Sequence, residues 1–426
     1  MKKSRRAFLQ DAAMGAAALI AGIRSETRDA IESLAPGREM GRADFPELRK
    51  QYMLSEDITY LNHASIGTIP RPVHEAREKY LEVCESNPWR YMWSGEWDEP
   101  REEVRAKAAD YLNASADDIA FTHNTTEVFN LLAHGLDLGD GDEVLYSSLN
   151  HAGASICFEK FGPEYGYSVN SFEIPFGEAG ALDRQELLDR YDRHITSSTR
   201  LLVLPHIDNT VGLRHPLADF SRLARDRGVD YVAVDAAQTV GMIPIDLEEA
   251  GVDVLATSAH KWLQAPKGIS LAYFSPRIRQ ELKPMWVTWG QNREAWQGTA
   301  RLYEDYGTRN LPELLTLGHA IDFQNKIDRG EREAYLKELH EFARGQADAW
   351  LDTGWKSPVD WEMGGSLYAV EIRSKPANAF HRELWVNNAM VFRPFEAENF
   401  NCVRLSPNIL TSKEEVERFF ELTGRA

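Results

Sequence analysis

The sequence predicts an α/β fold, with a large domain built on a mostly parallel sheet and a smaller C-terminal α+β domain. Two observations support this prediction. From about Pro70 to Pro276, helical patterns alternate with short strand patterns. The strands are almost continuously apolar, which is typical of parallel strands covered by helices on both faces.

The alternating region begins with helical patterns at 71–85 and 101–112. Further helical patterns separate the strands, at 125–136, 183–195 and 217–228. The apolar strand segments are 118–122, 142–147, 200–205, 230–235, 252–258 and 269–274.

Beyond Pro276 the pattern changes. A helix is predicted over 311–327, with Leu314, Leu317 and Ile321 on one stripe. A second helix follows at 331–351, and strands are predicted at 366–372 and 401–407. Ser412 and Glu415 form a capping-box pattern at the start of the closing helix.

Composition restricts the function classes. The chain has 426 residues, and 48 basic against 66 acidic side chains give a net charge of −18. This acidity argues against nucleic acid or an anionic membrane surface as a partner, because both require positive surface. Cys84, Cys157 and Cys402 show neither metal-ligand spacing nor a disulfide framework. No segment is long and apolar enough to predict a membrane-spanning helix.

The N-terminus has the layout of an export signal. Arg5 and Arg6 precede Phe8 and Leu9, and an apolar, alanine-rich segment follows. This pattern resembles the twin-arginine signal of proteins that are exported already folded. We therefore predict a signal peptide at 1–24, the twin-arginine export machinery as a partner, and a periplasmic or extracytoplasmic location. The alternative is an alanine-rich helix start on a cytoplasmic protein.

Three further boundaries follow from these patterns. Residues 25–55 are predicted to be a linker or N-terminal segment. Residues 56–310 are predicted to be the large domain, and 311–426 the small domain. Ala16-Ala17-Ala18 fits a small-x-small cleavage site, but cleavage there leaves a short apolar region.

Polar side chains follow five of the strands in the large domain. In open α/β sheets, ligands bind beyond the carboxyl ends of the strands. Taken singly, these residues also fit ordinary helix capping or loop packing. They are Thr125 and Thr126, Asn150 and His151, Asn209, Asp235 and Gln238, and Ser258, His260 and Lys261.

Together these residues are the parts that a pyridoxal phosphate site requires. A lysine must form a Schiff base with the cofactor and then move protons at the substrate α-carbon. A carboxylate must keep the pyridine nitrogen protonated, so that the ring acts as an electron sink. Hydroxyl groups at a helix N-terminus suit the phosphate. No metal is predicted.

The segment VDAAQTVGMIPIDLEEAGVDVLATSAHKWLQAPKGISLAYF resembles the class V aminotransferase family of fold type I pyridoxal-phosphate enzymes. The resemblance covers most of the chain after residue 55, starting at YLNHASIGTIPRPV. It implies a seven-stranded type of sheet in the large domain. It also implies a homodimer with active sites at the interface, because YEDYGTRN matches a segment whose Thr308 reaches the partner's phosphate.

The resemblance also implies residue roles. Lys261 is the Schiff-base lysine, Asp235 faces the ring nitrogen, and His151 stacks on the ring. Cofactor contacts are expected from Thr125, Thr126, Asn209, Gln238, Ser258, His260 and Thr308. Substrate contacts are expected from Arg404, whose position matches the family's carboxylate-binding arginine, and from Asn62 and His63.

Three features bear on the reaction type. The segment before Arg404, VFRPFEAENF, lacks the mobile-loop cysteine of cysteine desulfurases, and Cys402 on a strand is interpreted as a packing residue. SNPWRYMWSGEW and WQGTARLYEDYGTRN are most similar to isopenicillin N epimerase-like proteins. Trp89, Trp93 and Trp97 line a substrate cleft or pack at the dimer interface.

The predicted function is therefore a pyridoxal-phosphate enzyme acting at the α-carbon of an amino acid or a derivative. Epimerisation is the leading reading. The alternatives are C–S lysis or cysteine desulfuration, true transamination, and a non-catalytic cofactor-binding scaffold. These reactions share their first half, so the residues named above do not distinguish them.

Overall fold

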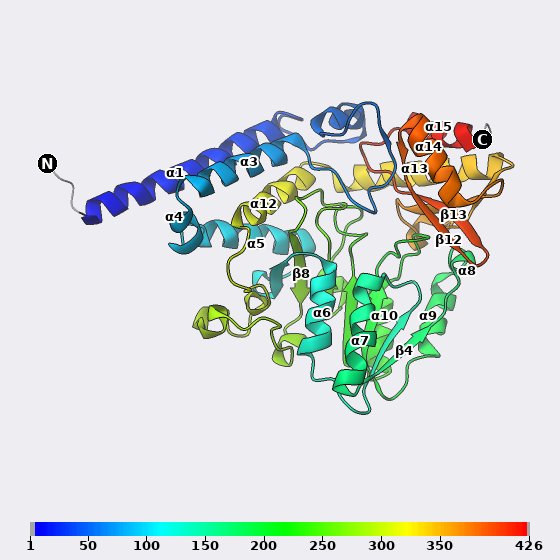
Figure 1. Cartoon of the computed structure of the whole chain (residues 1–426), viewed down its shortest axis with the longest axis horizontal. Helices are drawn as coiled ribbons and strands as arrows, with labels where there is room; N and C mark the ends of the chain where they lie inside the picture. Colours follow the sequence, from blue (N-terminus) through cyan, green and yellow to red (C-terminus); the bar gives the residue numbers. More distant parts are fainter. Residues whose placement is uncertain (1–4, 424–426) are drawn as a thin grey trace.

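The computed structural model describes residues 5–423 (Figure 1). Its centre is a seven-stranded sheet with the order β2-β8-β7-β6-β5-β3-β4. The strands are β2 (Ile119–Thr122), β3 (Glu143–Ser147), β4 (Ser168–Phe172), β5 (Thr199–Pro205), β6 (Tyr231–Asp235), β7 (Val254–Ala256) and β8 (Ser270–Phe274). The mostly parallel sheet expected from the sequence is confirmed.

Only β8 runs against its neighbours in this sheet. It pairs antiparallel with β2 and with β7, whereas β3, β4, β5, β6 and β7 pair in parallel. The carboxyl ends of all the other strands therefore lie at one edge. That edge carries the polar residues that the sequence singles out.

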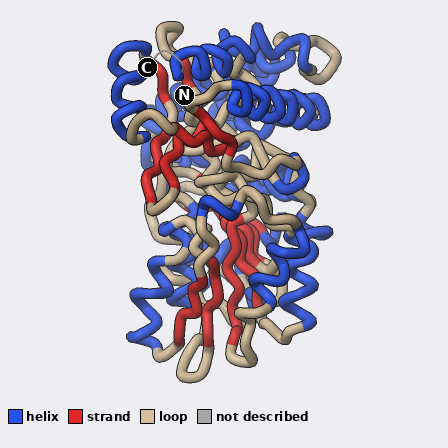
Figure 2. Tube along the Cα trace, turned by 90° about the vertical axis from the view of Figure 1, so that its right-hand side faces the viewer, coloured by secondary structure: helices blue, strands red, loops and turns tan. Residues whose placement is uncertain are grey.

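Helices cover both faces of the sheet, which leaves its strands buried (Figures 1 and 2). In β6, Tyr231 and Ala233 pack into one apolar cluster, and Val232 and Val234 into another on the opposite face. The helices of this part are α3 (Arg71–Ser86), α4 (Pro88–Trp93), α5 (Asp98–Leu112), α6 (Thr125–Gly135), α7 (Ile156–Tyr165), α8 (Phe176–Ala179), α9 (Arg184–Asp192), α10 (Leu217–Asp226) and α11 (Leu247–Ala250).

The C-terminal part contains a four-stranded antiparallel sheet of order β12-β13-β10-β9. Its strands are β9 (Thr353–Trp355), β10 (Tyr368–Ile372), β12 (Arg393–Ala397) and β13 (Phe400–Leu405). The helices here are α12 (Leu311–Asn325), α13 (Arg329–Ala349), α14 (Ala377–Asn388) and α15 (Lys413–Thr423). The predicted capping box is present, with Ser412 N–H donating to Glu415 Oε2 and Glu415 N–H to Ser412 Oγ.

The segment 25–55, predicted to be a linker or N-terminal segment, is structured and packed on the rest of the chain. Helix α1 runs from Arg5 to Glu32 beside α3, and its Ile20, Ile23 and Ile31 are buried. Short helical turns follow, including α2 (Phe45–Leu48). The apolar spacing of α1 matches a helix that docks on a core.

The start of the chain also joins the C-terminal part. Strand β1 (Thr59–Tyr60) pairs in parallel with β11 (Met390–Val391), and Leu61 belongs to the apolar cluster of the C-terminal sheet. Residues 62–67 are thereby held beside β13.

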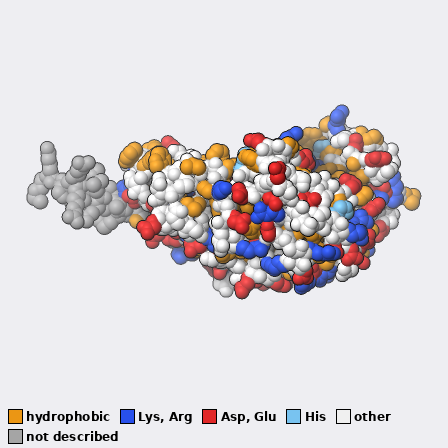
Figure 3. Space-filling view, turned by 90° about the horizontal axis from the view of Figure 1, so that it is seen from below, with side chains coloured by type: hydrophobic (Ala, Val, Ile, Leu, Met, Phe, Trp, Pro, Cys, Tyr) orange, Lys and Arg blue, Asp and Glu red, His pale blue; other side chains and the backbone are white. Residues whose placement is uncertain are grey.

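The surface carries acidic and basic side chains interspersed on the face shown in Figure 3. Within residues 5–423 no helix combines the length and the apolar character needed to cross a membrane. In the same residues, no group of His, Cys, Asp and Glu side chains comes together to hold a metal ion.

Candidate active site

A cavity opens at the carboxyl ends of the central strands. Residues from five strand ends meet there, as the sequence predicts. Its lining comprises Thr125, Thr126, His151, Gly153, Pro205, Ile207, Asn209, Asp235, Ala237, Gln238, Ser258 and Lys261. We call it the cofactor cavity.

Lys261 lies in the turn that follows β7. Burial lowers the pKa of its amine to about 8, and the nearby Asp235 charge acts in the opposite direction. A lysine whose pKa is lowered in this way is more readily deprotonated, as a nucleophilic amine must be.

Asp235 ends β6 and is buried. Burial raises the pKa of its carboxyl group, while the Lys261 charge lowers it. Oδ1 accepts a hydrogen bond from the Ala237 N–H at 2.9 Å. Asp235 and Lys261 both line the cavity, where a ligand could contact each of them.

The predicted phosphate-binding residues lie at the start of α6. Thr125 and Thr126 are the first residues of this helix, and the Asn124 side chain caps it by accepting a hydrogen bond from Glu127 N–H. Thr125 Oγ1 and Ser258 Oγ are hydrogen-bonded at 2.9 Å, which joins the start of α6 to the turn that carries Lys261. Backbone N–H groups of a helix start and two hydroxyls make a suitable anion site.

His151 stands at the exposed side of the cavity. Its Nδ1 accepts a hydrogen bond from Gly153 N–H at 3.0 Å, which fixes the ring. A Cβ at Gly153 would lie 2.6 Å from Thr126 Oγ1 and 3.0 Å from His151 Nδ1. Only glycine fits between the two site residues.

Arg404, on β13, is a buried cation without a carboxylate partner among the described residues. It is 1% exposed. Its guanidinium donates to the Asn209 carbonyl at 2.5 Å, Asn62 Oδ1 at 3.0 Å and Ser65 Oγ at 2.7 Å, all neutral acceptors. Burial, and then the nearby Arg393, lower the pKa of Arg404, while the Asp208 charge acts in the opposite direction. A buried cation with no carboxylate in direct contact favours binding of an anion.

Gln238 and Asn62 link the cavity to its surroundings. Gln238 Nε2 donates to the Ala64 carbonyl at 3.0 Å, and its Oε1 accepts from Trp262 Nε1 at 2.8 Å. Asn62 reaches Arg404 rather than the cavity itself.

Five residues predicted to contact cofactor or substrate do not line this cavity: Asn62 and Arg404, described above, and His63, His260 and Thr308. His63 is fully buried between Tyr60 and Trp262, and burial lowers its pKa to about 3. His260 is not part of the cavity lining, and burial lowers its pKa to about 4. Thr308 is exposed and borders other cavities.

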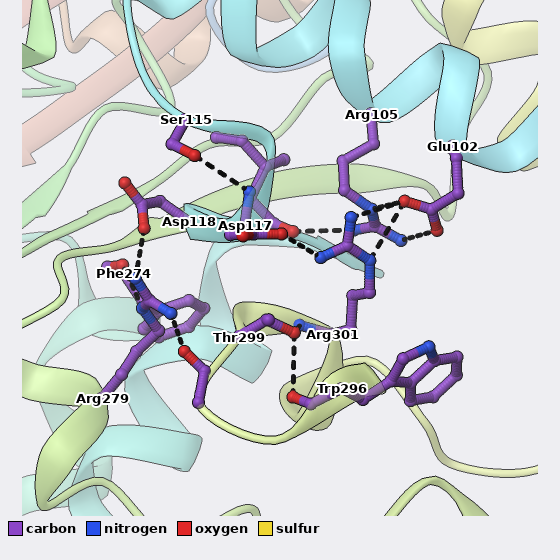
Figure 4. Close-up of polar contacts among 12 residues, drawn as sticks. Glu102, Arg105, Ser115, Asp117, Asp118, Phe274, Arg279, Trp296, Thr299 and Arg301 are labelled. Carbon is purple, nitrogen blue, oxygen red and sulfur yellow. Dashed lines mark hydrogen bonds and ion pairs between the residues drawn. The ribbon is translucent and has the colours of Figure 1, made fainter. Parts of the chain in front are cut away.

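The segment that carries Thr308 is fixed by buried ion pairs. Glu304 is fully buried and binds Arg105 at 2.8 Å and Arg309 at 3.2 Å. Arg105 and Arg301 both contact Glu102 (Figure 4). This network holds residues 301–309 against α5.

Several site residues have no counterpart among the sequence predictions. Gly67 packs against the lysine turn, and its N–H donates to the His260 carbonyl at 2.8 Å. Gln264 adopts φ of 60° and accepts from Tyr52 and Gln324 side chains. Asp208 accepts three backbone N–H groups and so shapes the turn that presents Asn209. The contacts of Gly67 and Gln264 join distant segments, which local patterns do not reveal.

The cysteines are all buried, whereas the three tryptophans singled out in the sequence differ in exposure. Cys84, Cys157 and Cys402 are free and buried, and burial raises the pKa of the Cys402 thiol to about 12. Trp97 is buried, whereas Trp89 and Trp93 are stacked on each other and exposed.

The cofactor cavity fits pyridoxal phosphate. It offers a buried amine, a buried carboxylate, a hydroxyl-lined helix start and an imidazole at its edge. Each of these groups has a use for the cofactor: its aldehyde, its ring nitrogen, its phosphate and its ring face.

Comparison with known proteins agrees with this fit. The family model described as aminotransferase class-V matches residues 59–419. Isopenicillin N epimerase of Amycolatopsis lactamdurans is 29% identical over 387 residues, covering 88% of this chain and 96% of that protein. A probable cysteine desulfurase of Methanothermobacter thermautotrophicus is 31% identical over 289 residues, covering 66% of this chain and 70% of that protein.

A solved structure shares the fold. The C-DES mutant with glycine covalently linked to its PLP cofactor superposes with a TM-score of 0.79 at 21% identity. The match covers 88% of this chain and 98% of that one.

Proposed function

Because this chain belongs to the class V aminotransferase family of pyridoxal-phosphate enzymes, we propose that it abstracts or exchanges the α-proton of an amino acid or amino-acid derivative, with epimerisation as the outcome. The observation that carries this proposal is the meeting of Lys261, Asp235 and His151 in one cavity, beside a buried Arg404 that lacks a carboxylate partner.

The cofactor is pyridoxal 5'-phosphate, which supplies an electron sink for negative charge at the α-carbon when bound. Lys261 would hold the cofactor's aldehyde carbon, and its amine, once the substrate amine has displaced it, would move the α-proton. Asp235 would keep a proton on the ring nitrogen, and the helix start at Thr125 and Thr126 would hold the phosphate.

Arg404 positions the substrate. Its guanidinium binds the α-carboxylate, and contacts to Asn62 and Ser65 hold the side chain still. A bidentate arginine–carboxylate pair fixes the α-carbon within reach of Lys261.

Two observations favour epimerisation over desulfuration: the burial of Cys402 and the extent of the match to isopenicillin N epimerase. Cysteine desulfuration through a persulfide needs an accessible thiolate, but Cys402 lies fully buried on β13. The match to the epimerase also extends over nearly the whole of both chains. C–S lysis without a protein thiol and transamination are the remaining alternatives.

We also propose a homodimer. Thr308 is exposed and lies outside the cofactor cavity of its own chain. A role for Thr308 in phosphate binding, as the family resemblance implies, therefore requires a second subunit. Analytical ultracentrifugation of the holoenzyme tests this proposal, and a monomer at micromolar concentration would contradict it.

Export by the twin-arginine route to the periplasm or beyond is a further proposal. Arg5 and Arg6 lie in the first turn of α1, and their side chains are outside the described part of the structure. The sequence pattern of paired arginines before an apolar segment is the support for this proposal.

The deciding experiment measures α-proton exchange. The purified holoenzyme is incubated in D₂O with D- and L-amino acids, cysteine and cysteine conjugates, and products are identified by NMR, chiral chromatography and sulfide assay. We expect deuterium at the α-carbon and interconversion of enantiomers for at least one substrate. Keto-acid or sulfide products would establish an alternative reaction instead.

Lys261→Ala is the matched control. It should lose exchange, and borohydride should no longer fix the cofactor to the chain, as read by mass spectrometry. Exchange at the normal rate in this variant would rule out the role of Lys261. A wild-type holoenzyme that exchanges no compound in the panel would favour a scaffold.

A further inference from the structure

A second arginine lies directly opposite Arg404 in the C-terminal sheet. Arg393 begins β12, and its register partner on the neighbouring strand β13 is Arg404 (Figure 1). Side chains paired in this way point to the same face of an antiparallel sheet. Arg404 donates to the carbonyl of Asn209, which lines the cofactor cavity, so this face of the sheet is turned towards that cavity.

One aromatic ring lies close to both guanidinium groups. The guanidinium carbon of Arg393 is 5.1 Å from the centroid of the Phe395 ring, and that of Arg404 is 5.6 Å from the same centroid. Contacts of this kind between a cation and an aromatic ring are attractive. The two positive groups are therefore held near each other, although Arg404 is buried and Arg393 is exposed.

The charge of Arg393 also acts on residues of the cofactor cavity. Burial lowers the pKa of Lys261 to about 8, the Asp235 charge opposes this shift, and the charges of the two arginines add to it. Burial lowers the pKa of His151, and the Asp235 charge again acts in the opposite direction. The charges of Lys261, Arg393 and Arg404 lower the pKa of His151 further. Because such effects weaken with distance, Arg393 lies near the groups that the proposed chemistry uses.

No carboxylate contacts either of these two arginines among residues 5–423. The neighbouring carboxylates are engaged elsewhere. Glu371 shares this face of the sheet, because its register partner is Cys402, but it contacts Lys356 at 3.2 Å and Arg373 at 3.3 Å. Asp208 accepts three backbone N–H groups. Like charges directly opposite each other are unfavourable, so this pair of cations favours a ligand with two negative groups.

We propose that the substrate is an amino acid with a second carboxylate on its side chain, and that Arg393 binds this carboxylate while Arg404 binds the α-carboxylate. This inference rests on the proposed function and names its substrate class. Two planar guanidinium groups beside one ring suit two carboxylates joined by a short aliphatic chain, because each group binds carboxylate oxygens in pairs. Arg393 is thus a specificity-determining residue, and its effect is on substrate binding rather than on proton transfer.

Binding of unreactive dicarboxylates tests this inference without α-proton chemistry. Glutarate and adipate carry two carboxylates, and their monoamides, glutaramate and adipamate, replace one carboxylate by an amide of similar shape. In calorimetric titrations of the holoenzyme, at least one diacid should bind saturably and roughly tenfold or more tightly than its monoamide, because only the diacid engages both arginines by charge-assisted hydrogen bonds. Equal binding of diacid and monoamide, or no saturable binding of either diacid, would contradict the inference.

Substitutions assign this preference to one side chain. Arg393→Met should bind diacid and monoamide alike, whereas Arg393→Lys should keep part of the preference because it keeps the charge. Arg404→Met should weaken binding of both compounds by roughly tenfold or more, because both carry the first carboxylate. Arg329 is the matched control: it is exposed, its guanidinium carbon is 4.7 Å from the Tyr111 ring centroid, and it does not line the cavity. Arg329→Met should keep the wild-type preference.

α-Proton exchange in D₂O then connects this site to the reaction. Both enantiomers of aspartate, glutamate and 2-aminoadipate are compared with their side-chain amides. At least one acid should have a KM roughly tenfold or more below that of its amide, and Arg393→Met should raise KM for that acid only. Exchange with equal kcat/KM for acids and amides overturns the inference and leaves the proposed function standing. A diacid preference that depends on Arg393, without exchange of any amino acid, supports the binding site and counts against the proposed function.

The remaining outcomes also decide. A diacid preference that persists in Arg393→Met, or that is lost equally in Arg329→Met, overturns the inference. The oligomeric state of each variant is measured in parallel. A preference lost only in variants whose oligomeric state changes would assign Arg393 to subunit contact instead.

Discussion

At the scale of single residues, the candidate active site is distinguished by buried charged groups that form no ion pair among the described residues. Lys261 lines the cofactor cavity, Arg404 lies next to it, and Asp235 is a carboxylate at the end of an apolar strand. Asp235 and Lys261 were indicated by their places at the end of one apolar strand and in the turn after another, whereas Arg404 lies within β13 and its role was implied by the family resemblance. His63 lies outside the cavity, and its neighbours in the sequence do not show that its ring packs near Trp262.

Asp235→Asn should affect the free energy of unfolding and the rate of α-proton exchange in different ways. Folding raises the pKa of Asp235, so its ionised form lowers the free energy of unfolding of the cofactor-free protein at neutral pH. This penalty declines as the pH falls through the raised pKa and is absent below the ordinary pKa of an aspartate, and the amide lacks it at any pH. The thermal unfolding temperature of the variant without cofactor should therefore be unchanged or higher.

The same variant should slow α-proton exchange by on the order of 10²-fold or more, because an amide does not keep the ring nitrogen protonated. Single-turnover exchange in D₂O measures this rate. An exchange rate equal to that of the wild type would refute the role assigned to Asp235.

Arg404→Met should raise KM for substrates with a free α-carboxylate by roughly 10- to 100-fold, the contribution of one or two charge-assisted hydrogen bonds. Substrate amides should show little change. Cys402→Ala on the same strand is the control, and it should keep the wild-type KM because the thiol is packed away from the cavity. Steady-state kinetics with acid and amide pairs tests both; loss of activity in Cys402→Ala alone would favour a desulfurase.

At the scale of elements, the alternation of strands and helices could be predicted from the sequence, because each buried strand is a short apolar run. Strand β4 escaped prediction, since Ser168–Phe172 is an edge strand whose side chains are largely exposed. Helix α1 spans the boundary between the predicted signal peptide at 1–24 and the predicted linker or N-terminal segment at 25–55, although Ile20, Ile23, Thr27 and Ile31 recur at helical spacing.

The loop at 62–67 could not have been predicted, because its contacts join distant parts of the sequence. Gly67 lies so close to the lysine turn that a Cβ would sit 2.0 Å from the Lys261 carbonyl oxygen and 2.7 Å from that of His260. Both are backbone atoms, so a side chain there requires the loop to move.

Gly67→Ala should therefore displace this loop from Lys261 and disturb the contacts of Ala64 with Gln238 and of Ser65 with Arg404. We expect a loss of about 1–3 kcal/mol in the free energy of unfolding, together with a raised KM. Gly345→Ala is the control, because no atom lies within 4 Å of the added Cβ in α13. It should stabilise the protein by about 0.5–1 kcal/mol. Denaturant titration compares the two, and equal stability in both would contradict the close packing.

At the scale of the whole molecule, the N-terminal helix connects folding to the proposed export. The described side chains of α1 change from exposed to buried at Ile20, after the exposed Ala17, Ala18 and Leu19. The helix thus divides into a projecting part and a docked part (Figure 1). Cleavage after Ala18 would remove the projecting part and keep the docked residues on the fold.

Changing Arg5 and Arg6 together to lysine should block export and leave full-length precursor in the cytoplasm, because the twin-arginine route requires the pair while the charge is retained. Cell fractionation measures export, and N-terminal sequencing locates the cleavage site. A variant lacking residues 2–18 should keep the unfolding temperature of the full chain, since Ile20, Ile23 and Ile31 remain buried. Unimpaired export of the lysine variant, or a wild-type protein found only in the cytoplasm, would exclude the signal. A mature N-terminus beyond Ile23 would show that the docked part of α1 is removed as well.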